Sequence, residues 1–258
     1  MYQPVIDAHI HVDKYHKNEQ KIILQELDTY GIESLIAVSE NLISAKENLA
    51  LAQKNKRIKP AFGWHPEQEL PTGNEIADIQ NMIVQNQDEM AAVGEVGLPY
   101  YLRKKHPKIP LEPYVEILEL FIRQAVQLDK PIVLHAIYED APTVCGLLGK
   151  YDVSKAHFHW FKGNSETTER MIQNGYLISI TPDVIYEAEI QQLVWDYPLK
   201  QMMVETDGPW PFKGPFENKL THPKMMHQTI REIAKIKKMN ITEVYNVLFE
   251  NTKRFYNV

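Results

Sequence analysis

Short apolar runs alternate along the chain with longer stretches in which apolar residues recur every three or four positions. The short runs are rich in Val, Ile and Leu, which is typical of strands that are buried on both faces of a parallel sheet. We predict a strand in each of them, over residues 5–10, 34–38, 58–63, 91–96, 132–135, 156–160, 176–180 and 202–205.

The longer stretches have the spacing of amphipathic helices. Two clear apolar stripes are formed by Ile22, Ile23, Leu27 and Tyr30 and by Val115, Leu118, Ile122 and Ala125. Gly31 follows the first stripe and predicts the end of that helix. We predict two closing helices, over residues 221–236 and 241–249, with Thr221 as the N-cap of the first.

This alternation of strand and helix implies βα units and a parallel sheet. Eight such units in a chain of 258 residues favour an α/β fold of the TIM-like (β/α)8 type, closed or slightly distorted, which takes about 250 residues. An open doubly wound sheet is the alternative, but it would carry a glycine-rich loop after its first strand, where this chain has Ala-His-Ile-His-Val-Asp. We find no linker or repeat, and we predict a single domain over residues 1–258.

Charge and cysteine content narrow the class of protein. The formal net charge is -6, whereas proteins that read DNA sequence usually carry a basic stripe, so we expect no sequence-specific nucleic-acid binding. The one cysteine, Cys145, excludes an internal disulfide and is expected in the core. We see neither a signal-peptide pattern nor an apolar run of ~18 residues, and we expect a cytoplasmic protein without a membrane partner. The oligomeric state is not predicted.

The first strand ends in three polar residues at alternate positions, Asp7, His9 and His11. Alternate residues of a strand share a face, so these side chains need a reason to lie together at an otherwise apolar strand end. Metal binding supplies one, because neutral imidazoles bind divalent cations and a nearby carboxylate can bind the metal or orient a histidine. A hydrogen-bonded core histidine would explain one of the two histidines, but explains the pattern less well.

Further residues of ligand type stand at the ends of other predicted strands. These are Glu95, His135, His159 and Asp207. A buried, ionised Glu95 is very costly unless it is paired or bound to a cation, and the glycines on either side of it permit close approach. The carboxyl ends of barrel strands are where active sites lie. The joint pattern therefore predicts one site at that end.

We predict that this site binds two divalent metal ions, Zn, Mn or Mg, because all ligands offer nitrogen or oxygen. The candidate ligands are His9, His11, Glu95, His135, His159 and Asp207. Six ligands exceed the needs of one tetrahedral ion, and Glu95 is the simplest bridge between two. Such a pair, ~3.5–4 Å apart, generates a hydroxide near neutral pH. Glu95 and Asp207 are thus the predicted catalytic residues, and Asp207 would accept the proton of the water.

Other residues near the strand ends are candidates for substrate contact. His65 follows the third strand and is predicted to touch substrate, with a hydrogen-bonded loop histidine as the alternative. Trp210 is predicted to contact substrate, by stacking on a base or by lining an apolar pocket. Trp64 and Trp160 lie at comparable positions, although rim packing is the alternative for all three tryptophans. The basic run 103–105 either meets a phosphate or is a solvated face. Supporting roles around the ligands are open for Asp7, His157 and Glu205.

These residues resemble the TatD-type metal-dependent hydrolases of the amidohydrolase superfamily. The matching segments are D-A-H-I-H at 7–11, G-W-H-P at 63–66, G-E-V-G-L-P-Y-Y at 94–101, P-I-V-L-H at 131–135, H-W-F-K-G at 159–163, E-T-D-G-P-W at 205–210 and N-T-K-R-F-Y at 251–256. The resemblance implies a TIM-like barrel, two divalent metals on the six ligands above, and hydrolysis of phosphodiester bonds in DNA.

The chain departs from the family pattern where substrate would sit. Pro99 stands where the family often has Asp, and residues 136–140 lack the arginine that often follows the strand-five histidine. The leading hypothesis is a deoxyribonuclease-like enzyme acting on DNA ends. The first alternative is a two-metal hydrolase of a small ester, lactone or amide, and the second is a non-catalytic barrel that binds metal.

Overall fold

The computed structural model describes residues 2–258 and contains an eight-stranded sheet. All neighbouring strands pair in parallel and in chain order. The strands are β1 (Val5–Ile10), β2 (Ile32–Val38), β3 (Ile58–Phe62), β4 (Ala92–Gly97), β5 (Ile132–His135), β6 (Ala156–Phe158), β7 (Leu177–Ile180) and β8 (Met202–Val204). Each predicted strand is present, with ends displaced by at most two residues.

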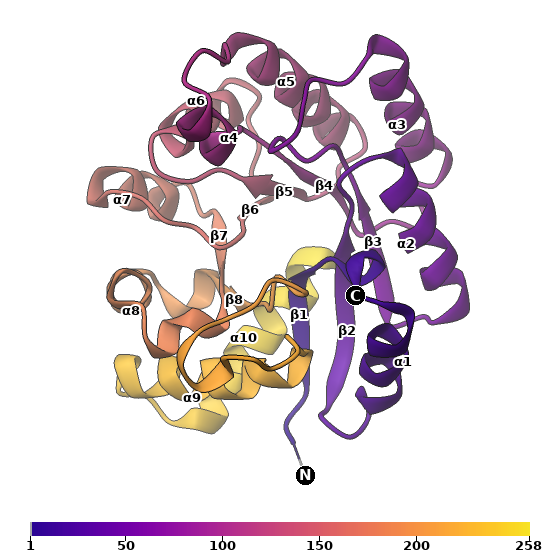
Figure 1. Ribbon diagram of the computed structural model, residues 1–258. Helices are drawn as coiled ribbons and strands as arrows, with labels where there is room; N and C mark the ends of the chain where they lie inside the picture. The colour runs from indigo at the N-terminus through magenta and orange to yellow at the C-terminus, as the bar shows by residue number, and fades with distance from the viewer. Residues whose placement is uncertain (1) are drawn as a thin grey trace.

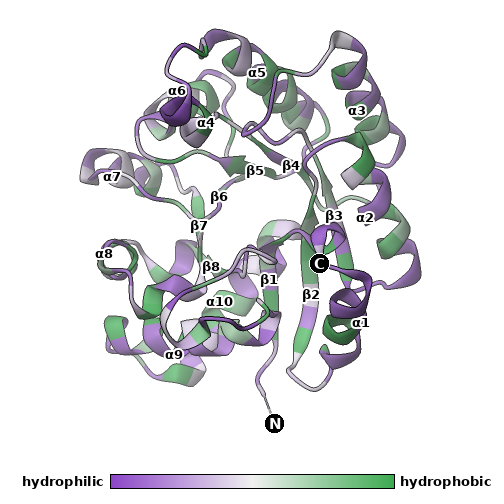
Figure 2. Ribbon diagram, viewed as in Figure 1, coloured by the Kyte–Doolittle hydropathy of each residue, from purple (hydrophilic) through white to green (hydrophobic). Residues whose placement is uncertain are grey.

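Helices surround the strands, and the sheet curves into a nearly closed barrel (Figure 1). They are α1 (Lys17–Glu26), α2 (Leu42–Lys54), α3 (Gly73–Gln85), α4 (Tyr100–Lys105), α5 (Glu112–Gln127), α6 (Asp140–Lys150), α7 (Ser165–Gln173), α8 (Ala188–Asp196), α9 (Met226–Lys237) and α10 (Ile241–Tyr256). Hydrophobic and hydrophilic residues mix along these helices (Figure 2), as expected when one face packs on the strands. The predicted TIM-like barrel is confirmed, and the strand order excludes the doubly wound alternative.

The barrel closes between β1 and the residues that follow β8. The backbone N–H of Asp207 donates to the His9 carbonyl at 2.9 Å, and the N–H of His11 donates to the Gly208 carbonyl at 2.8 Å. Helix α10 packs against both β1 and β8 from below this seam. The closure therefore brings two of the predicted ligand segments together at the carboxyl ends of the strands.

The first helix ends earlier than the apolar pattern predicts. Helix α1 ends at Glu26, with Leu27 as its C-cap, and the following residues form turns. Gly31 has a φ of +62°, and a Cβ there would lie 2.9 Å from the Gln3 carbonyl oxygen. The glycine therefore serves the entry into β2 and not the end of the helix.

The two closing helices also differ in their bounds from the prediction. Thr221 is not an N-cap: its hydroxyl donates to the Trp210 carbonyl at 2.5 Å, and a 3-10 turn, Pro223–Met225, precedes α9. Helix α10 runs to Tyr256, beyond the predicted end at residue 249. The apolar stripe fades there because a buried Asn251 replaces an apolar residue and donates to the carbonyls of Leu199 and Met202.

The barrel interior is filled by a small cluster of its own. Residues from six strands and from α10 pack together in it, and this is possible only inside the barrel. Its buried members are Ile6, Ala8, Ile36, Val38, Ala61, Ala91, Ala92, Val133, Met203 and Tyr256. These side chains lie inside the barrel, below the polar residues at the carboxyl ends of the strands. Cys145 lies in the larger core between strands and helices, as predicted.

Candidate metal centre

A cavity of about 590 Å³ opens at the carboxyl ends of the strands. Five of the six predicted ligands line it, namely His11, Glu95, His135, His159 and Asp207. The sixth, His9, is fully buried beside them. The loop that follows β8 contributes Trp210 and Pro211 to the wall. The structure thus gathers all six residues from five strand ends at one point.

Glu95 lies at the centre of this cluster. Its Oε2 atom is 3.2 Å from Nε2 of His9 and 3.5 Å from Nε2 of His11. Its Oε1 atom faces the other way, at 2.7 Å from Nε2 of His159 and 3.1 Å from Nδ1 of His135. The two oxygens of the Glu95 carboxylate therefore contact two separate pairs of imidazoles.

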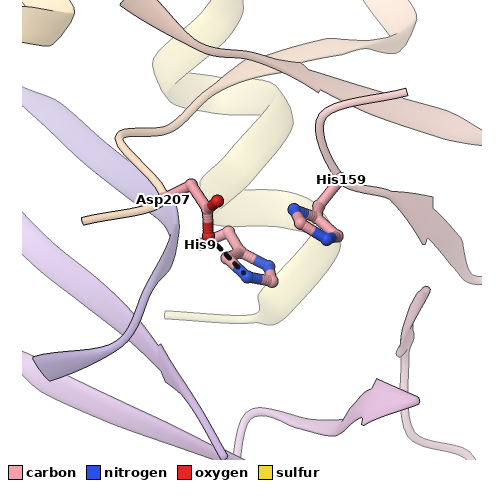
Figure 3. A group of neighbouring side chains, drawn as sticks. All are labelled: His9, His159 and Asp207. Carbon is pink, nitrogen blue, oxygen red and sulfur yellow. Dashed lines mark ion pairs between the residues drawn. The ribbon is translucent and has the colours of Figure 1, made fainter. Parts of the chain in front are cut away.

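Asp207 completes the group around His9. Its Oδ1 atom is 3.3 Å from Nε2 of His9 and 3.5 Å from Nε2 of His11. Figure 3 shows this carboxylate turned toward the His9 ring, with His159 approaching from the other side. The His9 and His159 rings stack with their centroids 3.8 Å apart. A side chain of β1, one from the residue after β6 and one from the residues after β8 thus face one another.

Asp207 holds this position with an uncommon backbone. Its φ is +48°, in the left-handed region that asparagine and aspartate tolerate better than other residues with a side chain. The turn directs the carboxylate into the cavity, while the N–H stays bonded to the His9 carbonyl. Backbone strain of this kind concentrates at functional sites.

Two glycines of β4 bring the next strand close to Glu95. Gly97 pairs with His135 in the sheet, and a Cβ built on it would lie 1.9 Å from the His135 carbonyl oxygen. At Gly94 a Cβ would lie 2.6 Å from Cβ of Val133. Both glycines have a φ near +158°, at the limit of what other residues adopt. The close approach expected from the sequence is therefore that of β5, and it sets His135 beside Glu95.

The residues of the cluster fit a divalent cation. Several buried polar atoms there have no hydrogen-bond partner: Nδ1 and Nε2 of His9, Nδ1 of His11, Oε2 of Glu95, Nδ1 of His159 and Oδ1 of Asp207. Such atoms are destabilising unless something else satisfies them. Ligands that are each ~2.1 Å from a tetrahedral ion are ~3.4 Å apart, close to the spacings observed around Glu95 and Asp207. Three groups can each hold an ion: His9, His11 and Glu95; His9, His159 and Asp207; and His65, Glu95 and His135.

The charges in the cluster also suit a cation. Burial alone would raise the pKa of Glu95, but the neighbouring His65, His159 and His9 hold that pKa well below its usual range. Burial raises the pKa of Asp207, but the nearby imidazoles of His11, His9 and His159 outweigh it, so this pKa is lowered as well. Both carboxylates are therefore ionised and ready to balance a positive charge.

His65 stands closer to the cluster than the sequence pattern suggests. Its Nε2 atom is 3.2 Å from Oε1 of Glu95, and its side chain lines the cavity. Burial lowers its pKa, and the charge of Glu95 only partly offsets this effect. Since a neutral imidazole can bind an ion as well as a substrate oxygen, both roles are open to His65.

Glu67 was missed by the sequence reasoning. Its Oε1 atom is 3.2 Å from Nε2 of His135, on the side of the ring away from Glu95. The same carboxylate accepts the backbone N–H groups of Tyr101 at 2.8 Å and Leu102 at 2.6 Å, in the first turn of α4. A carboxylate that bonds a ligand histidine fixes its orientation. The only sequence signal was its place two residues after His65.

The residues with supporting or substrate roles divide into two groups. Trp160, Trp210 and Lys105 line the cavity, whereas Trp64 is buried beside Tyr114 outside the cavity lining, in keeping with the packing alternative. Three residues for which supporting roles were open are buried and do not line the cavity, namely His157, Glu205 and Asp7. Of the basic run 103–105, Arg103 pairs with Asp140 at 3.2 Å.

Asp7 joins the two edges of the barrel. Its carboxylate accepts the Thr206 backbone N–H at 3.0 Å and the Thr206 hydroxyl at 2.5 Å, together with the His9 N–H at 3.3 Å. The β1–β2 register shifts between Asp7 and Ile10, so strict alternation does not carry Asp7 to the side of His9. Burial, which outweighs these hydrogen bonds, raises its pKa to about 7. Asp7 thus connects β1 to the residues that follow β8 through its hydrogen bonds to Thr206.

We expect Asp7→Ala to lower the free energy of unfolding by about 3 kcal/mol, because two buried donors of Thr206 lose their acceptor. Urea denaturation measures this change. Thr206→Val, which removes only the hydroxyl donor, should lower it by about 1 kcal/mol. Equal effects of the two variants would contradict the role of Asp7 across the seam.

The barrel and the imidazole–carboxylate cluster at its carboxyl end together define a metal-dependent hydrolase. The chain belongs to the TatD related DNase family, whose family model matches residues 6–257. No helix within residues 2–258 has the length and apolar character to cross a membrane.

Relatives in sequence agree with this assignment, and a solved structure has the same fold. An "Uncharacterized metal-dependent hydrolase" of Haemophilus influenzae is 33% identical over 255 residues, which are 98% of this chain and 100% of the relative. The human "Deoxyribonuclease TATDN3" is 26% identical over 261 residues, 98% of this chain and 94% of the relative. The crystal structure of YJJV, a TatD homolog from Escherichia coli, superposes with a TM-score of 0.88 at 22% identity, covering 98% of each chain, and shows the same fold.

Proposed function

We propose that this protein hydrolyses phosphodiester bonds at the ends of single-stranded DNA. One observation carries the proposal: the cavity combines the ionised cluster at its base with aromatic walls and a cationic rim. Trp160, Trp210 and Tyr101 supply the aromatic rings, and Lys105 and Lys162 supply the positive charges. Bases stack on aromatic rings and phosphates pair with cations, which is how proteins bind single strands without reading their sequence.

The two tryptophans are suited to stacking. Trp210 is 48% exposed, and the Lys14 ammonium lies 5.4 Å from its ring centroid. The indole N–H of Trp160 donates to Oδ2 of Asp183 at 2.7 Å, which fixes that ring, and the Lys162 ammonium lies 5.5 Å from it. Each ring thus has a lysine beside it, so a base and its phosphate can be held together.

The named relative supports the same substrate. The human protein carries the name deoxyribonuclease, and its similarity extends over nearly the full length of this chain. The net charge of -6 favours local capture of a DNA end over binding along a duplex.

We assign the six predicted ligands to two divalent ions that share Glu95. His9, His11 and Asp207 would hold one ion, and His135 and His159 the other. When bound, such ions polarise a phosphoryl oxygen and lower the pKa of a water molecule toward 7. Asp207 would take the proton of the attacking water, since its carboxylate is ionised and lines the cavity. His65 would hold a substrate oxygen.

A second candidate is the hydrolysis of a small ester, lactone or amide. Ile137 lines the cavity two residues after His135, and Leu102 and Pro211 add further apolar surface. Glu67 brings a negative charge to the same wall, and its pKa is lowered because its bonds to His135 outweigh its burial. An acidic and partly apolar wall suits a small neutral substrate better than a chain of phosphates.

An assay on three substrate classes separates these candidates. Purified protein loaded with Mn²⁺ is incubated with end-labelled single-stranded oligonucleotide, with bis(p-nitrophenyl) phosphate, and with a panel of lactones. We expect mononucleotides from the oligonucleotide and slow cleavage of the chromogenic diester. Turnover of a lactone with neither phosphodiester cleaved would overturn the proposal and establish the second candidate.

Trp210 offers a sharper test of base stacking. We expect Trp210→Ala to raise KM for the oligonucleotide about tenfold with little change in kcat, because stacking contributes ~1–3 kcal/mol per base. Trp195→Ala is the matched control, since Trp195 on α8 is 53% exposed and has the Lys238 ammonium 5.5 Å from its ring. An unchanged KM in Trp210→Ala would remove Trp210 from the substrate site.

A further inference from the structure

A chain of buried polar side chains lies beneath His159, inside the barrel. The hydroxyl of Tyr256 is 2.6 Å from Nδ1 of His157, and Nε2 of His157 is 2.5 Å from Oγ of Ser179. The Ser179 hydroxyl in turn donates to Oε2 of Glu205. The chain therefore runs from the last helix, across β6 and β7, to the residue that follows β8.

All four side chains are shut off from solvent, with at most 3% of any of these residues exposed. Polar groups in an apolar interior are destabilising unless they bond to one another, and here each bond satisfies the next group. A network of this kind defines a single arrangement of its members, because none of them can turn without leaving a partner unbonded. The barrel floor thus contains one rigid polar element.

The direction of each hydrogen bond follows from the chemistry of the groups. Ser179 gives its one proton to Glu205, so its oxygen must accept from Nε2–H of His157. A neutral His157 ring carries one proton, which Nε2 donates to Ser179. Nδ1 of His157 then accepts from the Tyr256 hydroxyl. The Tyr256 hydroxyl also lies 3.3 Å from the Ala8 carbonyl oxygen, but its contact with His157 is shorter, at 2.6 Å, so the donors run from Tyr256 toward Glu205.

The hydrogen-bonded series ends at Glu205, which lies beside the metal centre. Oε1 of Glu205 accepts the Trp160 backbone N–H at 2.8 Å and lies 3.8 Å from Nδ1 of His159. That Nδ1 atom has no hydrogen-bond partner, and Nε2 of the same ring is 2.7 Å from Glu95. A histidine that binds a metal through one nitrogen usually gives its other N–H to a carboxylate. Glu205 is the carboxylate in reach.

We propose that Tyr256 and His157 are positioning residues of the metal centre, acting through Ser179 and Glu205 on His159. The proposal rests on the metal-binding part of the proposed function, and not on the identity of the substrate. By this route the C-terminal helix, whose pale yellow turns lie behind the cluster in Figure 3, contributes to metal affinity without touching the metal. Loss of the hydroxyl at Tyr256 leaves His157 free to turn, and the carboxylate at His159 loses its fixed place.

The affinity for Zn²⁺, measured by competition with a chromophoric chelator, tests this role directly. We expect Tyr256→Phe to weaken Zn²⁺ binding about tenfold, the lower end of the effect of groups that orient a ligand. In the assay with bis(p-nitrophenyl) phosphate, kcat at subsaturating Zn²⁺ should fall with it, while KM for the diester stays unchanged.

Tyr245→Phe is the matched control. Tyr245 lies on the same helix α10, is buried, and its hydroxyl is 2.8 Å from Nδ1 of a buried histidine, His227. His227 bonds on its other side to the Tyr30 carbonyl and leads away from the metal centre. Both variants should lose a similar amount of stability, about 1 kcal/mol, but only Tyr256→Phe should lose affinity for Zn²⁺.

Ser179→Ala breaks the same chain at its middle and provides a second route to the answer if Tyr256→Phe does not fold. It should weaken Zn²⁺ binding at least as much, and adding Tyr256→Phe to it should change the affinity no further. The proposal would be overturned if Tyr256→Phe or Ser179→Ala bound Zn²⁺ as tightly as Tyr245→Phe does. If the wild-type protein binds Zn²⁺ but does not cleave DNA, only the proposed DNA substrate is refuted. If it does not bind Zn²⁺, both the proposed function and the positioning role of Tyr256 and His157 are refuted.

Discussion

Asp207→Asn is expected to slow phosphodiester hydrolysis about 10³-fold, within the usual contribution of a general base. Asparagine keeps the size of the side chain, but it cannot take a proton from the attacking water and carries no charge. The kcat for bis(p-nitrophenyl) phosphate at saturating Mn²⁺ measures the loss. Circular dichroism should show an unchanged fold, because the backbone N–H bond to His9 does not involve the carboxylate.

Asp7→Asn is the control for this experiment. It removes a second buried carboxyl near the same seam, but Asp7 bonds to Thr206 and lies outside the cavity lining. Because burial raises its pKa to about 7, an uncharged amide resembles the form that the fold favours. We expect Asp7→Asn to keep most of its activity. Equal losses in the two variants would show that charge near the seam, and not proton transfer at Asp207, limits the reaction.

Glu95→Gln is expected to weaken metal binding more than about 100-fold, beyond the effect of groups that only orient a ligand. One carboxylate oxygen faces His9 and His11 and the other faces His135 and His159, so its loss should affect both groups. The metal content after dialysis, measured by elemental analysis, checks the result. Activity should disappear together with the metal.

Glu67→Gln makes the same chemical change on the other side of His135. Glu67 is 3.2 Å from Nε2 of that ring, whereas Glu95 is 3.1 Å from Nδ1. Since Glu67 orients His135 without facing the other imidazoles, we expect a loss of metal affinity of about tenfold. A larger loss in Glu67→Gln than in Glu95→Gln would contradict the bridging position of Glu95.

The fold was predictable because the strands are buried on both faces. A run such as Ile132–His135 is apolar at nearly every position, so its place in the chain is clear. The helix ends were predicted less well, because they depend on contacts that are distant in sequence. Helix α10 continues past residue 249 through Asn251, which bonds the backbone of a different element, and no local periodicity contains that information.

The site was predictable where ligand-type residues stand at strand ends. His9, Glu95 and Asp207 are recognisable there because a barrel brings all strand ends to one place. Glu67 and Tyr256 could not be found in this way. One lies in a loop, and the other is an ordinary tyrosine on a terminal helix that meets His157 only after the barrel closes. Of the two roles open to Trp64, the structure has the packing one, with its ring in the core.

The position of bound Mn²⁺ in a crystal, located by anomalous scattering, tests the central claim most directly. We predict two anomalous peaks, one between Glu95, His9, His11 and Asp207 and the other between Glu95, His135 and His159. No peak in this cavity at millimolar Mn²⁺, or peaks confined to other parts of the surface, would contradict the account.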